Sequence, residues 1–139
     1  MKKIIQVLAV VAAISTGSFA FGQSTSQAKV IAYYFHGSFR CVTCTNMEKY
    51  SQEAIESNFK DALTLGGLEF KAVNVEERGN EHFVNDYQLY TKALVLSMVK
   101  DGKEVGSKNL DKIWEFARNK QKFMDYVTGE IKEFMRDTQ

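Results

Sequence analysis

Proline is absent from this 139-residue sequence, and cysteine and histidine occur only twice each. Because a cis peptide bond before any other residue costs about 3 kcal/mol, we expect trans bonds. No Gly-x-Gly-x-x-Gly segment follows a predicted strand, so no flavin or nicotinamide site is expected on this chain. Internal repeats and low-complexity tracts are also missing.

Neither sign of charge dominates the composition. The chain has 18 Lys and Arg residues and 17 Asp and Glu residues, for a net charge of +1. This balance provides no reason to propose a nucleic acid or an anionic surface as a partner. Hydrophobic residues make up 45% and aromatic residues 12% of the chain, which supports a real core. The length suits one domain with at most a small second layer.

The N-terminus has the physical pattern of an export signal. Lys2 and Lys3 precede an apolar stretch at 4–14, and mostly small residues follow at 15–21. We therefore predict a signal peptide over residues 1–22 and a location in the periplasm or cell envelope. The alternative is an uncleaved membrane anchor, but the apolar stretch is short for a span. In an exported protein, oxidising surroundings favour a disulfide or a redox-active cysteine pair.

The rest of the chain divides into a leader and one domain. Residues 23–29 are polar and rich in Ser and Gln, which predicts a flexible leader, and residues 30–139 form the domain. The domain opens with a β-branched and aromatic run at 30–35, typical of a buried strand. Cys41 and Cys44 follow after a short loop, directly before a segment whose apolar spacing predicts a helix from about Thr45 to Phe59.

This placement has chemical consequences for the two cysteines. The unpaired N–H groups and positive dipole end of a helix N-terminus favour a thiolate, which is the reactive form. We expect Cys41 to be the exposed, attacking sulfur and Cys44 to close the disulfide one helical turn later. Arg40 adds a fixed positive charge, and His36 adds another when it is protonated. The predicted chemistry is reversible thiol–disulfide exchange.

Two other interpretations of the pair stay open. The first is an inert structural disulfide, although closing so short a loop removes little entropy from the unfolded chain. The second is a metal site. Cys41, Cys44 and Met47 form a soft sulfur set that suits Cu(I). Adding His36, or His82 from further along the chain, gives a four-ligand set that suits zinc.

The remaining patterns predict a strand at 68–75, a helix at 80–90 and a strand at 93–99. Asp101-Gly102 is a tight-turn signal, and residues 103–107 return as a fourth strand.

The apolar spacing in the C-terminal part predicts a helical region at 113–134, with a break near Asn119. Asn109 or Asp111 is predicted to cap its N-terminus. The first half of the domain is thus a strand–helix–strand unit, which implies a parallel pair with a right-handed crossover. The second half adds an antiparallel hairpin and a closing helix. The predicted fold class is α/β, with a four-stranded mixed sheet and helices on both faces.

These residues resemble the thioredoxin superfamily. The resemblance rests on the order of the elements, on Cys-x-x-Cys after the first strand, and on the hairpin at 99–103. It covers about residues 29–138. It implies a thioredoxin-like fold and a redox-active Cys41–Cys44 disulfide with no further cofactor.

The chain departs from the superfamily pattern in three ways. Thioredoxins have a cis-proline facing the Cys pair, whereas this chain has Thr-Lys-Ala-Leu at 91–94. In the family that loop pairs with substrate backbone and keeps metal from the cysteines. Its change puts general protein-disulfide reduction in doubt and favours the metal alternative. Val42-Thr43 replaces the usual Gly-Pro between the cysteines. The first strand carries no acidic residue that could be buried behind the pair and accept the proton of Cys44. This proton acceptor is therefore either missing or His36.

A narrower resemblance rests on residues 33–44 (Tyr-Tyr-Phe-His-Gly-x-x-Arg-Cys-x-Thr-Cys) and 108–115 (Lys-Asn-Leu-Asp-Lys-Ile-Trp-Glu). Both stretches are similar to the ArsF-type family of small exported thioredoxin-like proteins. These are described as nitrophenyl-compound nitroreductase subunits associated with arsenic-resistance clusters. The resemblance implies a membrane redox partner subunit and the reduction of aromatic nitro groups on organoarsenicals. His36 and Arg40 match its motif beside the two cysteines.

Three functions follow from these patterns. The first is an exported thiol–disulfide oxidoreductase or redox subunit that relays electrons to or from a membrane partner, with a thiol, disulfide or organoarsenical as substrate. The second is a dithiol module that binds Cu(I) or trivalent arsenic without redox turnover. The third is a non-catalytic interaction subunit in which the cysteines are dispensable.

Overall fold

The computed structural model describes residues 28–137. The predicted signal peptide at 1–22 lies outside the described residues, as does most of the predicted leader. Four strands and five helices form within the described range: β1 Lys29–His36, α1 Val42–Asn58, α2 Lys60–Thr64, β2 Leu68–Asn74, α3 His82–Asp86, β3 Ala93–Lys100, β4 Lys103–Asn109, α4 Ile113–Phe116 and α5 Lys120–Arg136.

The four strands form one mixed sheet in the order β2-β1-β3-β4. β1 and β2 run parallel, with Val30 opposite Leu68. β3 pairs antiparallel with both β1 and β4. The turn between β3 and β4 has positive φ at Asp101 (53°) and Gly102 (74°), as a tight hairpin turn requires. The four-stranded mixed sheet predicted from the sequence is confirmed, and its topology is that of a thioredoxin-like α/β fold.

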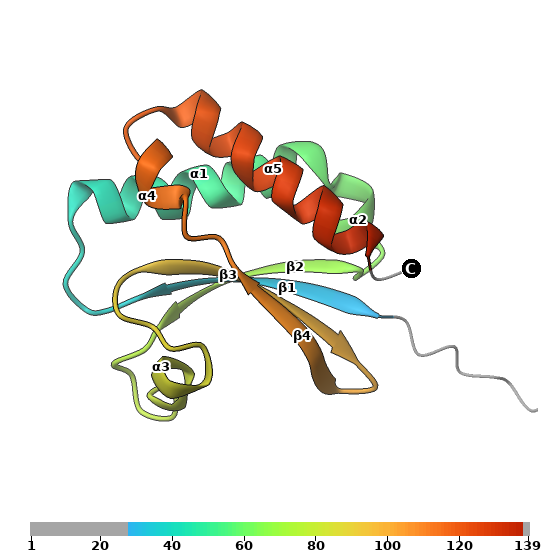
Figure 1. The fold of residues 1–139 in the computed structure, drawn as a ribbon, viewed down its shortest axis with the longest axis horizontal. Helices are drawn as coiled ribbons and strands as arrows, with labels where there is room; N and C mark the ends of the chain where they lie inside the picture. Colours follow the sequence, from blue (N-terminus) through green and yellow to red (C-terminus); the bar gives the residue numbers. More distant parts are fainter. Residues whose placement is uncertain (1–27, 138–139) are drawn as a thin grey trace, which may run out of the picture.

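Helices cover both faces of the sheet, as predicted (Figure 1). α1, α2, α4 and α5 lie on one face, and α3 lies on the other. Neighbouring side chains of a strand point to opposite faces, so Tyr34 and Phe35 enter different cores. Tyr34 joins the main core with Met47 and Phe123, and all three are 0% exposed. Phe35 joins a smaller cluster that includes Val95.

α5 closes the main core through Phe123, Val127 and Ile131, which recur every four residues and are fully buried. Asn119 caps the helix, because its side chain accepts the backbone N–H of Lys122 at 3.0 Å. This cap confirms the break predicted near Asn119.

The predicted cap at Asn109 or Asp111 is wrong. Asn109 is the last residue of β4 and pairs with Val95, so the sheet occupies this part of the chain. The residue before α4 is Lys112, and it makes no side-chain capping bond.

Two predicted helix lengths also change. The helix expected at 80–90 is only the five-residue α3, since Gln88 takes a positive φ of 51° that stops the helical path. The helix expected to end at Phe59 is followed directly by α2. Phe59 breaks the regular path between them with a φ of −131°. None of the helices within residues 28–137 is long and apolar enough to cross a membrane.

Candidate redox site

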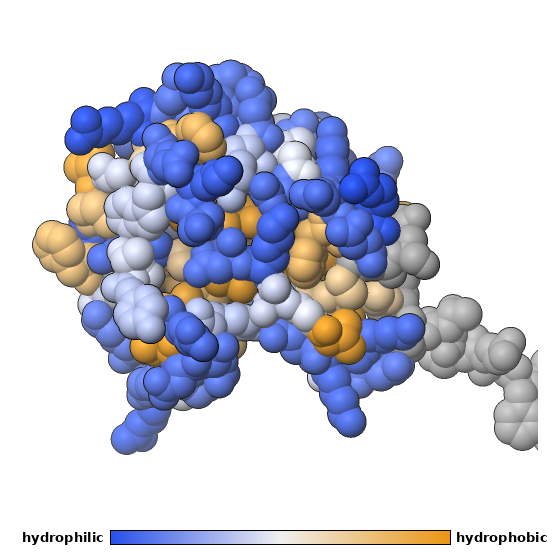
Figure 2. All heavy atoms as spheres, viewed as in Figure 1, coloured by the Kyte–Doolittle hydropathy of each residue, from blue (hydrophilic) through white to orange (hydrophobic). Residues whose placement is uncertain are grey.

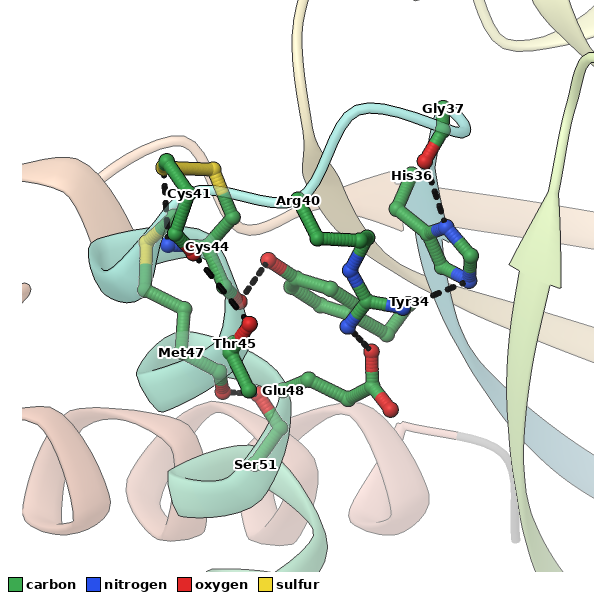
Figure 3. Close-up of polar contacts among 10 residues, drawn as sticks. All are labelled: Tyr34, His36, Gly37, Arg40, Cys41, Cys44, Thr45, Met47, Glu48 and Ser51. Carbon is green, nitrogen blue, oxygen red and sulfur yellow. Dashed lines mark hydrogen bonds and ion pairs between the residues drawn. A yellow bond between two sulfur atoms is a disulfide. The ribbon is translucent and has the colours of Figure 1, made fainter.

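Cys41 and Cys44 form a disulfide at the start of α1, with their Cα atoms 5.1 Å apart (Figure 3). Cys41 is the N-cap residue, and its Sγ accepts a hydrogen bond from the Cys44 backbone N–H at 3.1 Å. After reduction, the same amide and the helix dipole favour a thiolate on Cys41. The predicted position of the pair, at the first turn of the helix, is confirmed.

The two sulfur-bearing residues differ in their access to solvent. Cys41 is half-buried, whereas Cys44 is only 2% exposed. A partner can therefore approach Cys41, while Cys44 lies behind it in the core. This asymmetry fits the roles predicted for an attacking and a resolving cysteine.

Tyr34 lies directly behind the buried cysteine. Its hydroxyl donates a hydrogen bond of 2.7 Å to the backbone carbonyl of Cys44. Burial raises the pKa of Tyr34 above its usual range, and the negative charge of Glu48 raises it further. The phenol therefore stays protonated at neutral pH and keeps donating to the first turn of α1.

Arg40 joins two side chains on either side of the loop (Figure 3). Its Nη2 forms an ion pair with Glu48, and its Nη1 lies 3.3 Å from His36 Nε2. The other ring nitrogen of His36, Nδ1, lies 2.9 Å from the carbonyl oxygen of Gly37. A neutral imidazole with its hydrogen on Nδ1 satisfies both contacts. No hydrogen bond joins His36 to either sulfur; its Nε2 faces Arg40, the residue directly before Cys41.

The end of β2 holds the loop that carries the disulfide. The Ser38 N–H donates to Glu76 Oε2 at 3.0 Å, and Asn74 donates to the Ser38 hydroxyl at 3.2 Å. Hydrogen bonds from the Ser38 side chain and backbone lower the pKa of the Glu76 carboxyl, so it is ionised at neutral pH. A Cβ on Gly37 would lie 2.5 Å from Glu76 Oε1, so the carboxylate packs against a position where only glycine fits without a shift.

The segment before β3 is where the sequence departs from the thioredoxin pattern, since it has no proline. No cis peptide bond occurs within residues 28–137, in agreement with the predicted trans bonds. The Lys92 carbonyl accepts a hydrogen bond of 3.0 Å from Trp114 Nε1, which ties this segment to α4.

Two exposed apolar side chains lie next to the disulfide in the chain. Phe39 is 77% exposed and Val42 is 79% exposed, and they lie on either side of Arg40 and Cys41. Figure 2 shows apolar side chains at the end of the molecule where this loop lies. Such an apolar border suits the approach of a partner protein.

The alternative metal set is not assembled in full. Among residues 28–137, no three His, Cys, Asp or Glu side chains gather in a way that could hold a metal ion. His36 is engaged with Arg40 and Gly37, and His82 instead pairs with Asp86 at 2.7 Å. Met47 is fully buried one turn after Cys44. The three sulfur-bearing residues therefore lie at the start of α1, whereas both histidines of the alternative metal set have other partners.

Sequence reasoning assigned no role to three residues that the structure places around the disulfide. Tyr34 was expected only as part of a strand, and no role was predicted for Glu48 or Glu76. Their partners lie 8 to 38 positions away along the chain. The alternation in β1 does indicate that one of the two adjacent tyrosines faces α1, but no local pattern identifies its partner.

The strand order and the N-terminal disulfide of α1 define the class as an α/β protein of thioredoxin-like fold with a Cys-x-x-Cys pair. The chain matches no protein-family model. It also matches no curated protein. Among solved structures it is similar to thioredoxin from Fasciola hepatica, with 24% identity and a TM-score of 0.38. That alignment covers 72% of this chain and 79% of the thioredoxin. The fold assignment above rests on the sheet topology itself.

Proposed function

We propose that this protein is an exported thiol–disulfide redox protein that relays electrons within a nitrophenyl-compound nitroreductase system linked to organoarsenical resistance. The observation that carries the redox part is the geometry of the pair. Cys41 is accessible and receives an N–H at the start of α1, and Cys44 is buried behind it. The export and the nitroreductase context are supported by the N-terminal pattern and by the two stretches at 33–44 and 108–115.

The electron relay follows ordinary thiol–disulfide exchange. The Cys41 thiolate attacks one sulfur of a partner disulfide, and the other partner sulfur leaves as a thiolate that takes up a proton. The Cys44 thiol then loses its proton to solvent and attacks the Cys41 sulfur. This step restores the Cys41–Cys44 disulfide and releases the second partner thiolate, which is also protonated. Two electrons pass to the partner, and its two protons are taken from solvent, which had received one from Cys41 when it ionised and one from Cys44. The reverse sequence passes the electrons back.

The environment of the pair suits this exchange. The Cys44 N–H stabilises negative charge on Cys41 in both the free thiolate and the leaving-group role. The apolar side chains of Phe39 and Val42 border the reactive sulfur and offer contact area to a membrane redox subunit. No flavin or nicotinamide site is expected on this chain, so the reduction of a nitro group would take place on a partner.

The test is a trapping experiment with single cysteine variants. Cys44→Ser is expected to leave a mixed disulfide on Cys41 with partner proteins of the cell envelope, and Cys41→Ser is expected to trap nothing. The wild-type pair should equilibrate with glutathione at a potential of about −120 to −270 mV, the range of known redox motifs. A potential well below about −300 mV, with no trapped partner, would show that the bond is structural.

The same variants separate the relay from the dithiol alternative. Because the two sulfurs come within bonding distance, both reduced thiols can face one Cu(I) or trivalent arsenic. If the protein is such a binding module, either substitution abolishes binding of the ion and neither traps a partner.

A further inference from the structure

The mixed sheet ends in two edge strands, β2 and β4, which differ in regularity. The β3–β4 ladder shifts its register between Met98 and Val99. Such bulges twist an edge strand away from a pairing partner. β2, by contrast, pairs with β1 in an unbroken register from Leu68 to Asn74. The free side of β2 is therefore the more regular of the two sheet edges.

Hydrogen bonds at the two ends of β2 show which of its backbone groups face outward. At one end, the Val30 N–H of β1 donates to the Gly67 carbonyl at 2.9 Å. At the other end, the Val75 N–H donates to the His36 carbonyl, also at 2.9 Å. Backbone groups alternate between the two sides of a strand, so the odd-numbered residues of β2 face β1. The residues whose N–H and C=O groups face away from β1 are Leu68, Phe70, Ala72 and Asn74.

The outward groups of the first three of these residues have no hydrogen-bond partner within residues 28–137. The edge closes at Asn74, whose carbonyl accepts the Glu77 N–H at 3.3 Å. The open edge of β2 therefore comprises residues 68–72. The side chain of Ala72 at its end is exposed, which leaves room for an approaching strand. An unpaired edge of this kind is a template for a further strand.

The side chains of the open edge favour a second copy of this chain as the added strand. When two copies meet antiparallel at Phe70, Glu69 of each lies opposite Lys71 of the partner subunit. Opposite charges on directly opposed residues stabilise an antiparallel pair, and like charges destabilise it. Alignments centred on Glu69 or on Lys71 would oppose two carboxylates or two ammonium groups. Within one chain, Lys29 and Lys71 already contact Glu69, so the cross-strand pairs extend an existing alternation of charge.

The alignment at Phe70 also matches the backbone. It overlaps the open edge along its whole length, with Leu68 of one copy opposite Ala72 of the partner subunit and Phe70 opposite itself. All of these residues direct their N–H and C=O groups outward, so they form the hydrogen-bonded pairs of an antiparallel ladder. Glu69 and Lys71 then occupy the other positions, where facing side chains are closer. Their side chains are accessible, with exposed fractions of 35% and 42% respectively.

We propose that this protein forms a twofold-symmetric dimer in which the open edges of β2 pair antiparallel, centred on Phe70. The two sheets become one continuous sheet, as the self-complementary surface of a twofold interface allows. The disulfide loop follows the carboxyl end of β1, which runs parallel to β2 (Figure 1). The two disulfides therefore lie at opposite ends of the joined sheet, and both stay accessible to partners. The inference does not depend on the electron relay.

The test is sedimentation velocity on the purified full chain over a wide range of concentration. We expect a reversible monomer–dimer equilibrium, because the interface consists of one short strand from each copy. Ala72→Pro removes an outward N–H that makes no bond to β1, and proline is tolerated at such edge positions. This variant should stay monomeric at every concentration, whereas Ala72→Ser keeps the N–H and should dimerise like the wild type. Far-UV circular dichroism checks that both variants are folded.

Charge reversal tests the register. Lys71→Glu opposes carboxylates at both cross-strand pairs and should raise the dissociation constant of the dimer about tenfold. Adding Glu69→Lys to Lys71→Glu restores opposite charges at both pairs and should recover most of the affinity. Lys103→Glu, on β4 at the other edge of the sheet, is the matched control and should leave the dissociation constant unchanged.

Three results would overturn the proposal. The first is a wild-type protein that is monomeric throughout, which includes the case in which the N-terminal residues of the chain occupy the edge themselves. The second is a dimer that persists in a folded Ala72→Pro variant. The third is a charge series in which the double variant fails to recover affinity, or in which Lys103→Glu weakens the dimer as much as Lys71→Glu. If Ala72→Pro does not fold, the charge series alone decides.

Discussion

Glu48 decides how much charge Arg40 contributes to the site. The sequence alone suggests that Arg40 lends a fixed positive charge to Cys41, but the structure pairs its guanidinium with the Glu48 carboxylate. Opposite charges in contact cancel much of each other's field at the neighbouring sulfur. The thiolate on Cys41 is therefore stabilised mainly by the Cys44 N–H and the helix dipole, with a smaller contribution from Arg40.

Glu48→Gln is expected to strengthen the effect of Arg40 on Cys41. In a reduced Cys44→Ser background, a larger fraction of Cys41 should be thiolate at pH 7. Alkylation by iodoacetamide should then be about twofold to fivefold faster, which corresponds to an ion pair worth up to about 1 kcal/mol. The rate is measured by mass spectrometry.

Glu53→Gln serves as the control for this prediction. Glu53 lies on the same helix and pairs with Lys120, away from the disulfide loop. Its substitution should leave the alkylation rate unchanged. Equal rates for the two variants would mean that Glu48 has no electrostatic influence on Cys41.

At the scale of elements, the disulfide depends on segments that hold its loop and its helix in place. The β2 end binds the loop through Glu76 and Asn74, and α5 packs along α1. A well-formed α5 is thus needed to keep the helix that carries both cysteines against the sheet. The first turn of α5 depends on one capping side chain, Asn119.

Asn119→Ala is expected to lower the free energy of unfolding by about 1 kcal/mol, because it leaves a helix N–H without its side-chain acceptor. Asn119→Ser preserves an acceptor and should cost much less. Urea unfolding of the oxidised protein, followed by far-UV circular dichroism, measures both. A cap role is ruled out if the two variants are equally destabilised.

At the scale of the whole molecule, three half-buried or buried tyrosines link stability to alkaline pH. Burial raises the pKa of Tyr34 and Tyr126. Burial, followed by the bond to Glu104, raises the pKa of Tyr87 to about 12. In an unfolded chain a tyrosine titrates near 10. The unfolded state therefore loses its protons first as the pH rises.

We expect the free energy of unfolding to be insensitive to tyrosine ionisation below about pH 9 and to fall as the pH rises from about 10 towards 12. Tyr87→Phe removes one of the three groups, so its decline should be shallower. Urea unfolding at pH 8, 10 and 11 provides the comparison. A wild-type stability that stays constant across these three pH values would contradict the prediction.

Much of the fold follows from local patterns, and the exceptions have identifiable causes. The strands, the hairpin turn and the break at Asn119 depend on side-chain alternation and turn residues close together in the chain. The predicted helix at 80–90 is shorter than expected because Phe83 and Tyr87 are spaced to pack on Phe35, on the face of the sheet that α3 covers, and not to extend a helix beyond α3. Tertiary packing thus overrides the local pattern there.

The sequence by itself determined the class of the sheet, the position of Cys41 and Cys44 at the start of a helix, and the absence of any proline before β3. Each of these depends on residues that are neighbours in the chain. Only the tertiary structure decided that Arg40 is paired with Glu48 and that Glu76 holds the loop. The physical reason is that these contacts join separate elements, and their partners are set by how the strands and helices pack.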